Sequence, residues 1–212
     1  AQEVHMEGNP FGCSTLSVKN RDGGYLFGRN FDWNACSGLI VSARPEKGYA
    51  SVSTVNTDFV RAGGLDFSKL PSQIQAIVSL YAPLDGMNEK GLAVSVNMIQ
   101  DSASINQNTG KPDITTTTAI RLLLDKAANV EEALELLRQY DFHSSMGMMV
   151  HLALADADGR SVAAEYVDHE MIVTETPVVT NFYLADGEKQ GIGTAQSHTR
   201  YEILTQTLEE RG

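Results

Sequence analysis

The sequence predicts an α+β fold in which strands and helices form separate layers. Alternating apolar and polar residues over 14–30, 39–44 and 49–55 indicate a block of strands near the N-terminus. Two amphipathic helical patterns follow, over 120–127 and 130–137, and a further block of strands covers 149–175. Because strands and helices come in blocks rather than in regular alternation, a layered α+β fold is favoured over repeated βαβ units.

The first strands form a predicted hairpin. The runs STLSVKN and YLFGRN flank Arg21-Asp22-Gly23-Gly24, a typical turn sequence. The mixed segment 70–84 predicts a helix, and LAVSVNMI indicates a strand that follows a turn at 85–91. Residues 101–118 are polar and predict a loop that leads into the helical pair.

The helices are predicted from apolar side chains at positions i, i+3, i+4 and i+7. In the second helix of the pair, Asn129 is the expected N-cap and Glu132 occupies the capping-box position. A last amphipathic helix is expected over 197–210, with Ser197 as its cap and Tyr201 on its apolar side.

Composition narrows the range of functions. The chain of 212 residues carries 16 basic and 27 acidic side chains, a net charge of −11, which argues against nucleic acid as a partner. No apolar run approaches the roughly 18 residues of a membrane span, so membrane insertion is not expected. Two cysteines without CxxC or HExxH spacing predict neither a disulfide framework nor a metal site, and no cofactor is expected.

Cys13 lies in the small-residue stretch Gly12-Cys13-Ser14-Thr15, where a strand begins. A thiol in such a place is most simply a small buried apolar group. A second interpretation is a nucleophile, because Gly12 permits backbone geometries in which Cys13 attacks the carbonyl before it. Cleavage there would free an α-amino group of pKa about 7.7–8.0, suited to act as a general base.

The segment Gly28-Arg29-Asn30-Phe31-Asp32-Trp33 is a second candidate. Arg29 and Asp32 would point to opposite faces of a regular strand, so both serve one pocket only if the chain bends near Asn30. The alternative is a surface salt bridge, which contributes little to stability. The single Trp, at position 33, favours a structured corner.

Five segments in a fixed order then carry a resemblance. FGRNFDW, whose Arg29 lies 16 positions after Cys13, is followed by DGMNEKGLAVSVNM, LADADGRSVAAEY, VVTNFYL and SHTRYEIL. Together they resemble the choloylglycine hydrolase family of N-terminal-nucleophile amide hydrolases, which includes bile-salt hydrolases and penicillin V acylases. The resemblance runs from Cys13 to about Leu208 and implies a four-layer αββα sandwich.

The resemblance also implies roles for named residues. Cys13 would be the nucleophile, Arg29 would lie against its thiol, and Asp32 would hydrogen-bond and orient the free α-amino group. Asn97 and Asn181 match positions that supply oxyanion contacts.

Arg200, in SHTRYEIL, matches an arginine of the family's site. Without the resemblance, Asn97 and Asn181 are most simply interpreted as turn-forming residues. Arg200 would then be a solvent-facing residue in the first turn of a helix, where its positive charge opposes the helix dipole.

Other reactive side chains are interpreted as structural. Cys36 is expected to be buried, and a dyad of Cys13 with His143 or His151 is disfavoured. The segments expected to shape a substrate pocket begin with Phe31 and continue with 59–65, 98–102 and 146–149.

The resemblance implies hydrolysis of a linear amide C–N bond in an N-acyl small molecule such as a conjugated bile salt or penicillin V. Residues 1–12 are then a propeptide and 13–212 the N-terminal portion of the catalytic domain, with Gly12–Cys13 as the processing junction. Further expectations are a C-terminal portion outside this chain, which a second chain could supply, and a homo-oligomer. An acyltransferase using the same acyl-enzyme and a silent, unprocessed binding module are the alternatives. The compartment stays open between the bacterial cytoplasm and the exterior after signal removal.

Overall fold

Two antiparallel sheets form the centre of the molecule in a computed structural model that describes residues 12–33 and 36–211. The larger sheet has seven strands in the order β11 (Glu170–Glu175), β10 (Ser161–Val167), β9 (Val150–Ala155), β6 (Ala93–Met98), β5 (Asp85–Asn88), β4 (Ser51–Asn56) and β3 (Gly38–Ala43). The smaller sheet has three, in the order β12 (Val178–Val179), β1 (Gly12–Lys19) and β2 (Tyr25–Asp32). A parallel pair, β7 (Asp113–Thr115) and β8 (Asp141–His143), lies apart from both.

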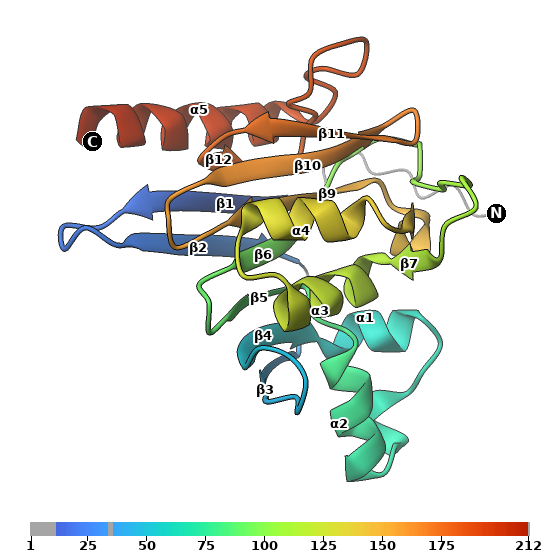
Figure 1. Ribbon diagram of the computed structural model, residues 1–212. Coiled ribbons are helices and arrows are strands. Elements are labelled where there is room, and N and C mark those ends of the chain that lie inside the picture. The colour runs from blue at the N-terminus through green and yellow to red at the C-terminus, as the bar shows by residue number, and fades with distance from the viewer. Residues whose placement is uncertain (1–11, 34–35, 212) are drawn as a thin grey trace.

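Helices cover the outer face of each sheet (Figure 1). The helices are α1 (Thr57–Ala62), α2 (Ser72–Leu80), α3 (Thr116–Lys126), α4 (Val130–Leu137) and α5 (Ala195–Arg211), with short 3-10 turns at Phe67–Lys69 and Ser145–Gly147. The apolar faces of α3 and α4 pack on the larger sheet, and α5 packs on β1 and β12 of the smaller one. The layers therefore run helix, sheet, sheet, helix, which confirms the αββα sandwich.

The main core lies between the larger sheet and the α3–α4 pair. Ile120, Leu124 and Leu134 of the two helices are fully buried there against sheet residues such as Leu152 and Leu154. Full burial of each such side chain stabilises the fold by about 1.5–3 kcal/mol. Small side chains occupy the space between the two sheets, where Ala153 and Ala163 contact Val179.

The expected hairpin is confirmed. β1 pairs with β2 from Gly12 opposite Asp32 to Lys19 opposite Tyr25. The side chain of Asn20 accepts hydrogen bonds from the backbone N–H groups of Asp22 and Gly24, and these contacts stabilise the turn. This register places the functional candidates of both strands at one end of the hairpin.

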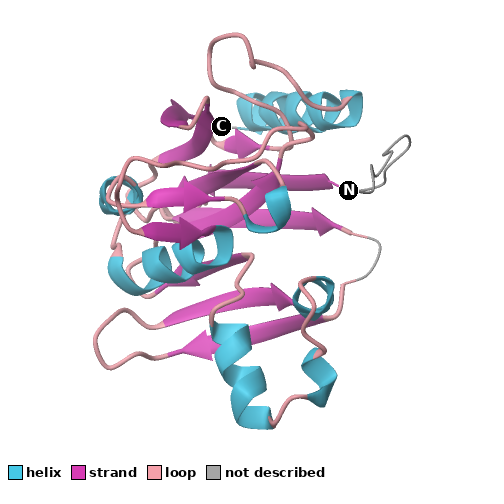
Figure 2. Cartoon of the chain, turned by 90° about the vertical axis from the view of Figure 1, so that its right-hand side faces the viewer, coloured by secondary structure: helices cyan, strands magenta, loops and turns pink. Residues whose placement is uncertain are grey.

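The structure differs from the sequence prediction at two places near the site. Residues 85–88, expected as a turn, form strand β5 between β4 and β6, and 57–62, where no helix was predicted, form α1. In β5, a Cβ on Gly86 would lie 2.7 Å from the Val52 carbonyl oxygen, so a glycine lets the strand pack closely. Both α1 and α2 lie at the β3–β4 end of the molecule, far from α5 (Figure 2).

Two predicted helix caps have different outcomes. The Asn129 side chain accepts from the Glu132 N–H at 2.9 Å, which confirms the N-cap of α4. Ser197 is not a cap, because α5 begins at Ala195 and Ser197 lies fully buried within it. Within the described residues, no helix has the length and apolar character needed to cross a membrane.

Candidate active site

Cys13 lies near the start of β1, paired with Phe31 of β2, and only 5% of its surface is exposed. Its sulfur is 3.7 Å from Nη2 of Arg29, which donates toward it. Arg29 reaches the sulfur because it lies two residues before Phe31 on the neighbouring strand. A guanidinium in this place is the kind of group that stabilises a thiolate.

Arg29 is held by contacts with two strands of the larger sheet, β5 and β6, and with its own strand. Its Nη1 donates to Asp85 Oδ2 at 2.5 Å and its Nη2 donates to the Val96 carbonyl at 2.7 Å. Its guanidinium carbon lies 4.8 Å from the ring centroid of Phe31. Thr54 donates to the other oxygen of Asp85. Sequence reasoning missed Asp85 because it read residues 85–91 as a turn.

The backbone of Cys13 is bound from the opposite side by Asn181 and Arg200. The Cys13 N–H donates to Asn181 Oδ1 at 2.7 Å, and Arg200 Nη2 donates to the same oxygen at 2.8 Å. Arg200 Nη1 donates to the Cys13 carbonyl and to Ser14 Oγ. The structure thus brings together four of the predicted residues, Cys13, Arg29, Asn181 and Arg200.

Gly12 also has a steric role beside the backbone freedom that the sequence suggested. A Cβ built on it would lie 2.7 Å from Nη2 of Arg200. The hydrogen bonds of Arg200 to Cys13, Ser14 and Asn181 hold that guanidinium in place. A side chain at position 12 would therefore displace a fixed group.

An apolar cavity of about 240 Å³ opens beside the Cys13 thiol. One wall is aromatic, with Phe31 stacked on Trp33 at 6.1 Å and the edge of Phe59 against both rings. Met98 and Met148 also line it, and each predicted pocket segment contributes a residue. A cavity of this kind suits an apolar group that is attached to the atom under attack.

Comparison with known proteins decides the family. Residues 13–182 match the family described as linear amide C–N hydrolases, choloylglycine hydrolase family. The chain belongs to this family. A curated penicillin V acylase of Pectobacterium atrosepticum is 30% identical over 116 residues, which are 50% of this chain and 31% of that protein. The chain thus spans about a third of the length of that curated relative.

Solved structures of the family share the fold. A mutant conjugated bile acid hydrolase from Clostridium perfringens has a TM-score of 0.66 at 18% identity, covering 93% of this chain and 72% of its own. A penicillin V acylase from Agrobacterium tumefaciens has a TM-score of 0.57 at 19% identity, covering 92% and 57%. These likenesses establish the N-terminal-nucleophile hydrolase fold for the chain.

Two further residues that the choloylglycine hydrolase motifs single out have other contacts. Asp32 lines the cavity, but its carboxylate accepts from Asn30 at 2.7 Å while Asn181 receives the Cys13 N–H. Asn97 is fully buried, and its amide donates to Thr15 Oγ1 and to the Val179 carbonyl, each at 3.1 Å. The Asn97 side chain therefore ties β6 to the smaller sheet, outside the cavity lining.

The remaining reactive side chains lie elsewhere in this family member. Cys36 is exposed, which corrects the expectation of burial. His143 contacts Asn106 and Asp113, and His151 contacts Glu165 and the Thr180 carbonyl, so neither makes a hydrogen bond to Cys13. Among the described residues, no group of three or more His, Cys, Asp or Glu side chains is placed to hold a metal ion.

Proposed function

We propose that Cys13 is the nucleophile of an amide hydrolase that acts on N-acyl small molecules with an apolar acyl group. The observation that carries the proposal is the thiol beside an apolar cavity, with Arg29 at 3.7 Å from the sulfur and the backbone nitrogen held by Asn181 at 2.7 Å. Membership of the linear amide hydrolase family supports the reaction type.

In the proposed reaction, the Cys13 sulfur attacks the carbonyl carbon of the substrate amide. The C–N bond then breaks, the amine leaves with a proton, and the acyl group stays on sulfur as a thioester. Water activated by the α-amine of Cys13 attacks the thioester, which releases the acid and restores the thiol. Asn181 and Asn97 are the proposed oxyanion residues. Both side-chain N–H groups of Asn97 donate to Thr15 and Val179 in this structure, so Asn97 would reach an oxyanion only if those contacts rearranged.

The α-amine exists only after residues 1–12 are removed. We propose that the Cys13 sulfur attacks the Gly12 carbonyl carbon, that the chain is transferred from nitrogen to sulfur, and that water then hydrolyses the thioester. Asp32 lies directly opposite Gly12 in the hairpin register. Cleavage after Gly12 would create the new amine at the residue next to this pair, and that proximity in the register supports the proposed orienting role of Asp32. Residues 1–11 lie outside the described part of the chain.

Intact mass spectrometry tests the proposal. The expected species begins at Cys13 and gains the mass of one acyl group when mixed briefly with an N-acyl amide at low pH, where thioester hydrolysis is slow. A full-length chain that persists and stays unacylated would instead identify a silent binding module. Adding an amine acceptor separates hydrolysis from acyl transfer, because a transferase would form a new amide.

Replacing Gly12 with alanine is expected to slow processing. The added Cβ must displace a guanidinium that donates three hydrogen bonds. A cost of about 1.4 kcal/mol in the processing transition state corresponds to about tenfold in rate. The rate is read from the decay of the full-length mass. Gly28→Ala is the control, because a Cβ there would meet only ordinary contacts with Leu16 at 3.8 Å, and equal rates for both variants would contradict the prediction.

Replacing Phe59 with alanine is expected to weaken binding of the acyl group. The substitution removes one side of the aromatic wall formed with Phe31 and Trp33. Loss of about 1.4 kcal/mol of apolar contact should raise KM about tenfold, while kcat changes less than about twofold because Cys13 and its partners are untouched. Phe67→Ala, outside the cavity lining, should leave KM unchanged. A fall in kcat at constant KM would show that Phe59 acts on the chemistry instead.

A further inference from the structure

A buried His–Glu pair lies behind the Cys13 site and takes no part in the reaction described above. His151 of β9 and Glu165 of β10 are both 0% exposed, and His151 Nδ1 lies 3.0 Å from Glu165 Oε1. Neither residue lines the cavity. Burying a pair of this kind costs desolvation energy that its mutual attraction often fails to offset, so stability alone is a poor explanation for its presence.

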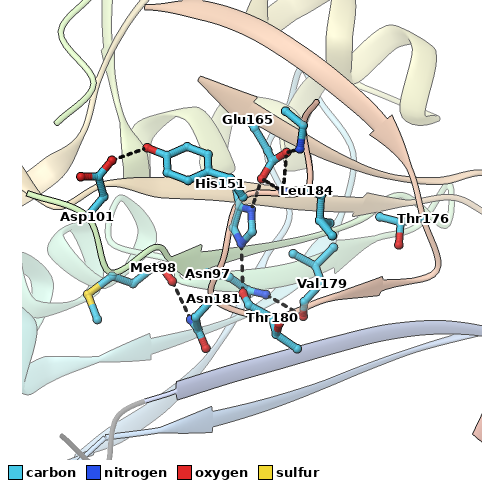
Figure 3. A network of polar contacts seen from close by, with 12 residues as sticks. Asn97, Met98, Asp101, His151, Glu165, Thr176, Val179, Thr180, Asn181 and Leu184 are labelled. Atoms are coloured by element: carbon cyan, nitrogen blue, oxygen red, sulfur yellow. Dashed lines mark hydrogen bonds and ion pairs between the residues drawn. The ribbon is translucent and has the colours of Figure 1, made fainter. Parts of the chain in front are cut away.

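The pair acts on the peptide unit that carries Asn181. His151 Nε2 lies 3.0 Å from the Thr180 carbonyl oxygen. Figure 3 draws this contact as a dashed line. Because that oxygen can only accept, Nε2 must donate to it. The N–H of the same peptide unit, that of Asn181, donates to Ser197 Oγ at 2.7 Å. Both polar groups of one peptide plane are therefore fixed, from β9 on one side and from α5 on the other.

Glu165 extends this restraint along the chain. Its Oε1 accepts from the Leu184 N–H at 2.9 Å, and its Oε2 accepts from the Ala185 N–H at 2.6 Å. The same carboxylate thus orients the His151 ring and holds the segment that follows Asn181. Residues 180–185 are restrained at both ends by a single pair of side chains.

The side chain of Asn181 depends on that restraint. Its Oδ1 accepts from Cys13 N at 2.7 Å and its Nδ2 donates to the Met98 carbonyl at 2.6 Å. Contacts this short tolerate little rotation of the peptide plane from which the side chain projects. A displacement of about 1 Å at a site of this type can reduce the rate about 100-fold.

We propose that His151 and Glu165 are positioning residues, which act through the Thr180–Asn181 peptide to hold the Asn181 carboxamide against Cys13. The inference rests on the proposed function for its kinetic readout, while its structural readout is independent of activity. Neither residue touches Cys13 or the cavity, so the pair would act without contact with the substrate.

The test is the Glu165→Gln variant, expressed as the whole chain and assayed after residues 1–12 have been removed. The amide has the size of the carboxyl group, but it carries no charge and one of its two acceptor oxygens is replaced by a donor, so the carboxylate's acceptance from His151 Nδ1 through one oxygen and from the Ala185 N–H through the other is not reproduced. We expect kcat to fall about 10- to 100-fold with KM within about twofold. The Asn181 side-chain NH₂ resonances, assigned by their loss in Asn181→Ala, should shift. Ser197→Ala, which frees the other side of the peptide plane, should give the same signature.

Tyr183→Phe is the matched control in the same segment. Burial raises the pKa of the Tyr183 hydroxyl and its hydrogen bond to Asp101 raises it further, so the group stays protonated and donates to that carboxylate at 3.0 Å. Its loss leaves every contact of the Thr180–Asn181 peptide intact. We therefore expect kcat and the Asn181 resonances to stay as in the unmodified chain.

Three results would overturn the inference. The first is a folded Glu165→Gln with unchanged kcat and unmoved Asn181 resonances, and the second is an equal loss of kcat in Tyr183→Phe. If Glu165→Gln does not fold, Ser197→Ala is tested by the same two measurements, kcat and the Asn181 side-chain resonances. The third overturning result is a Ser197→Ala variant in which those resonances do not shift. If the unmodified chain hydrolyses no amide, the proposed function fails, but the resonance shift in the variants still decides whether the pair positions Asn181.

Discussion

Replacing Cys13 with alanine is expected to abolish amide hydrolysis and the removal of residues 1–12 together. Both reactions begin with attack by the same sulfur, and no other thiol, hydroxyl or imidazole of the described residues donates to or accepts from the Arg29 guanidinium at the cavity. Loss of a nucleophile that acts with its partners as a unit reduces kcat by about 10⁴-fold or more. Turnover is measured with a chromogenic N-acyl amide, and processing is measured by intact mass.

Cys36→Ser is the control for this variant, because Cys36 is the exposed second cysteine. It should keep full turnover and normal processing. To exclude a defect that arises only from lack of processing, Cys13→Ala is also produced without residues 1–12, and it should stay inactive. Turnover by either form within about tenfold of the unmodified protein would remove Cys13 from the mechanism.

Local patterns predicted much of the fold. The alternation on both sides of Arg21–Gly24 predicted the β1–β2 hairpin, and the apolar spacing predicted α3 and α4 with Asn129 as cap. These signals are local, since a strand face or helix stripe shows its period within a few residues. They sufficed to place Cys13 and Arg29 on paired strands at the same end of a sheet.

Short elements were missed because tertiary contacts determine them. Strand β5 has four residues and contains Gly86, so its sequence has the character of a turn. It becomes a strand because it pairs on one side with β4, which is distant in sequence, and on the other side with β6, which follows it directly. The missed strand concealed Asp85, whose contact with Arg29 spans 56 positions.

The hydrogen-bond partners of the site residues were harder to predict than the residues themselves. The motif resemblance singled out Asn97 and Asn181 equally, yet the side chain of only one reaches Cys13. Ser197 resembled a helix cap in sequence, whereas its hydroxyl binds the Asn181 peptide instead. Hydrogen bonds of this kind join side chains from separate elements, so no local pattern records them.

Replacing Asn181 with alanine is expected to have the second-largest effect on turnover. The substitution leaves the Cys13 N–H, Arg200 Nη2 and the Met98 carbonyl without the partner they have in the structure. Loss of a donor aimed at a developing oxyanion costs about 10²–10³-fold in kcat. Each buried polar group left without a partner lowers the free energy of unfolding by roughly a further 1–3 kcal/mol. Steady-state kinetics and thermal unfolding measure the two effects separately, with Asn108→Ala, an exposed amide in a loop before β7, as the control.

Asn181→Asp separates the two functions of the carboxamide. The carboxylate can still accept from the Cys13 nitrogen and from Arg200, but it cannot donate to the Met98 carbonyl or to an oxyanion. If donation governs the chemistry, Asn181→Asp should lose kcat as fully as Asn181→Ala while keeping Cys13 and Arg200 in place. A variant with an aspartate here that retains most of kcat would mean that Asn181 serves by orienting the nucleophile's backbone, and the oxyanion donor would then have to be sought among the backbone N–H groups that line the cavity.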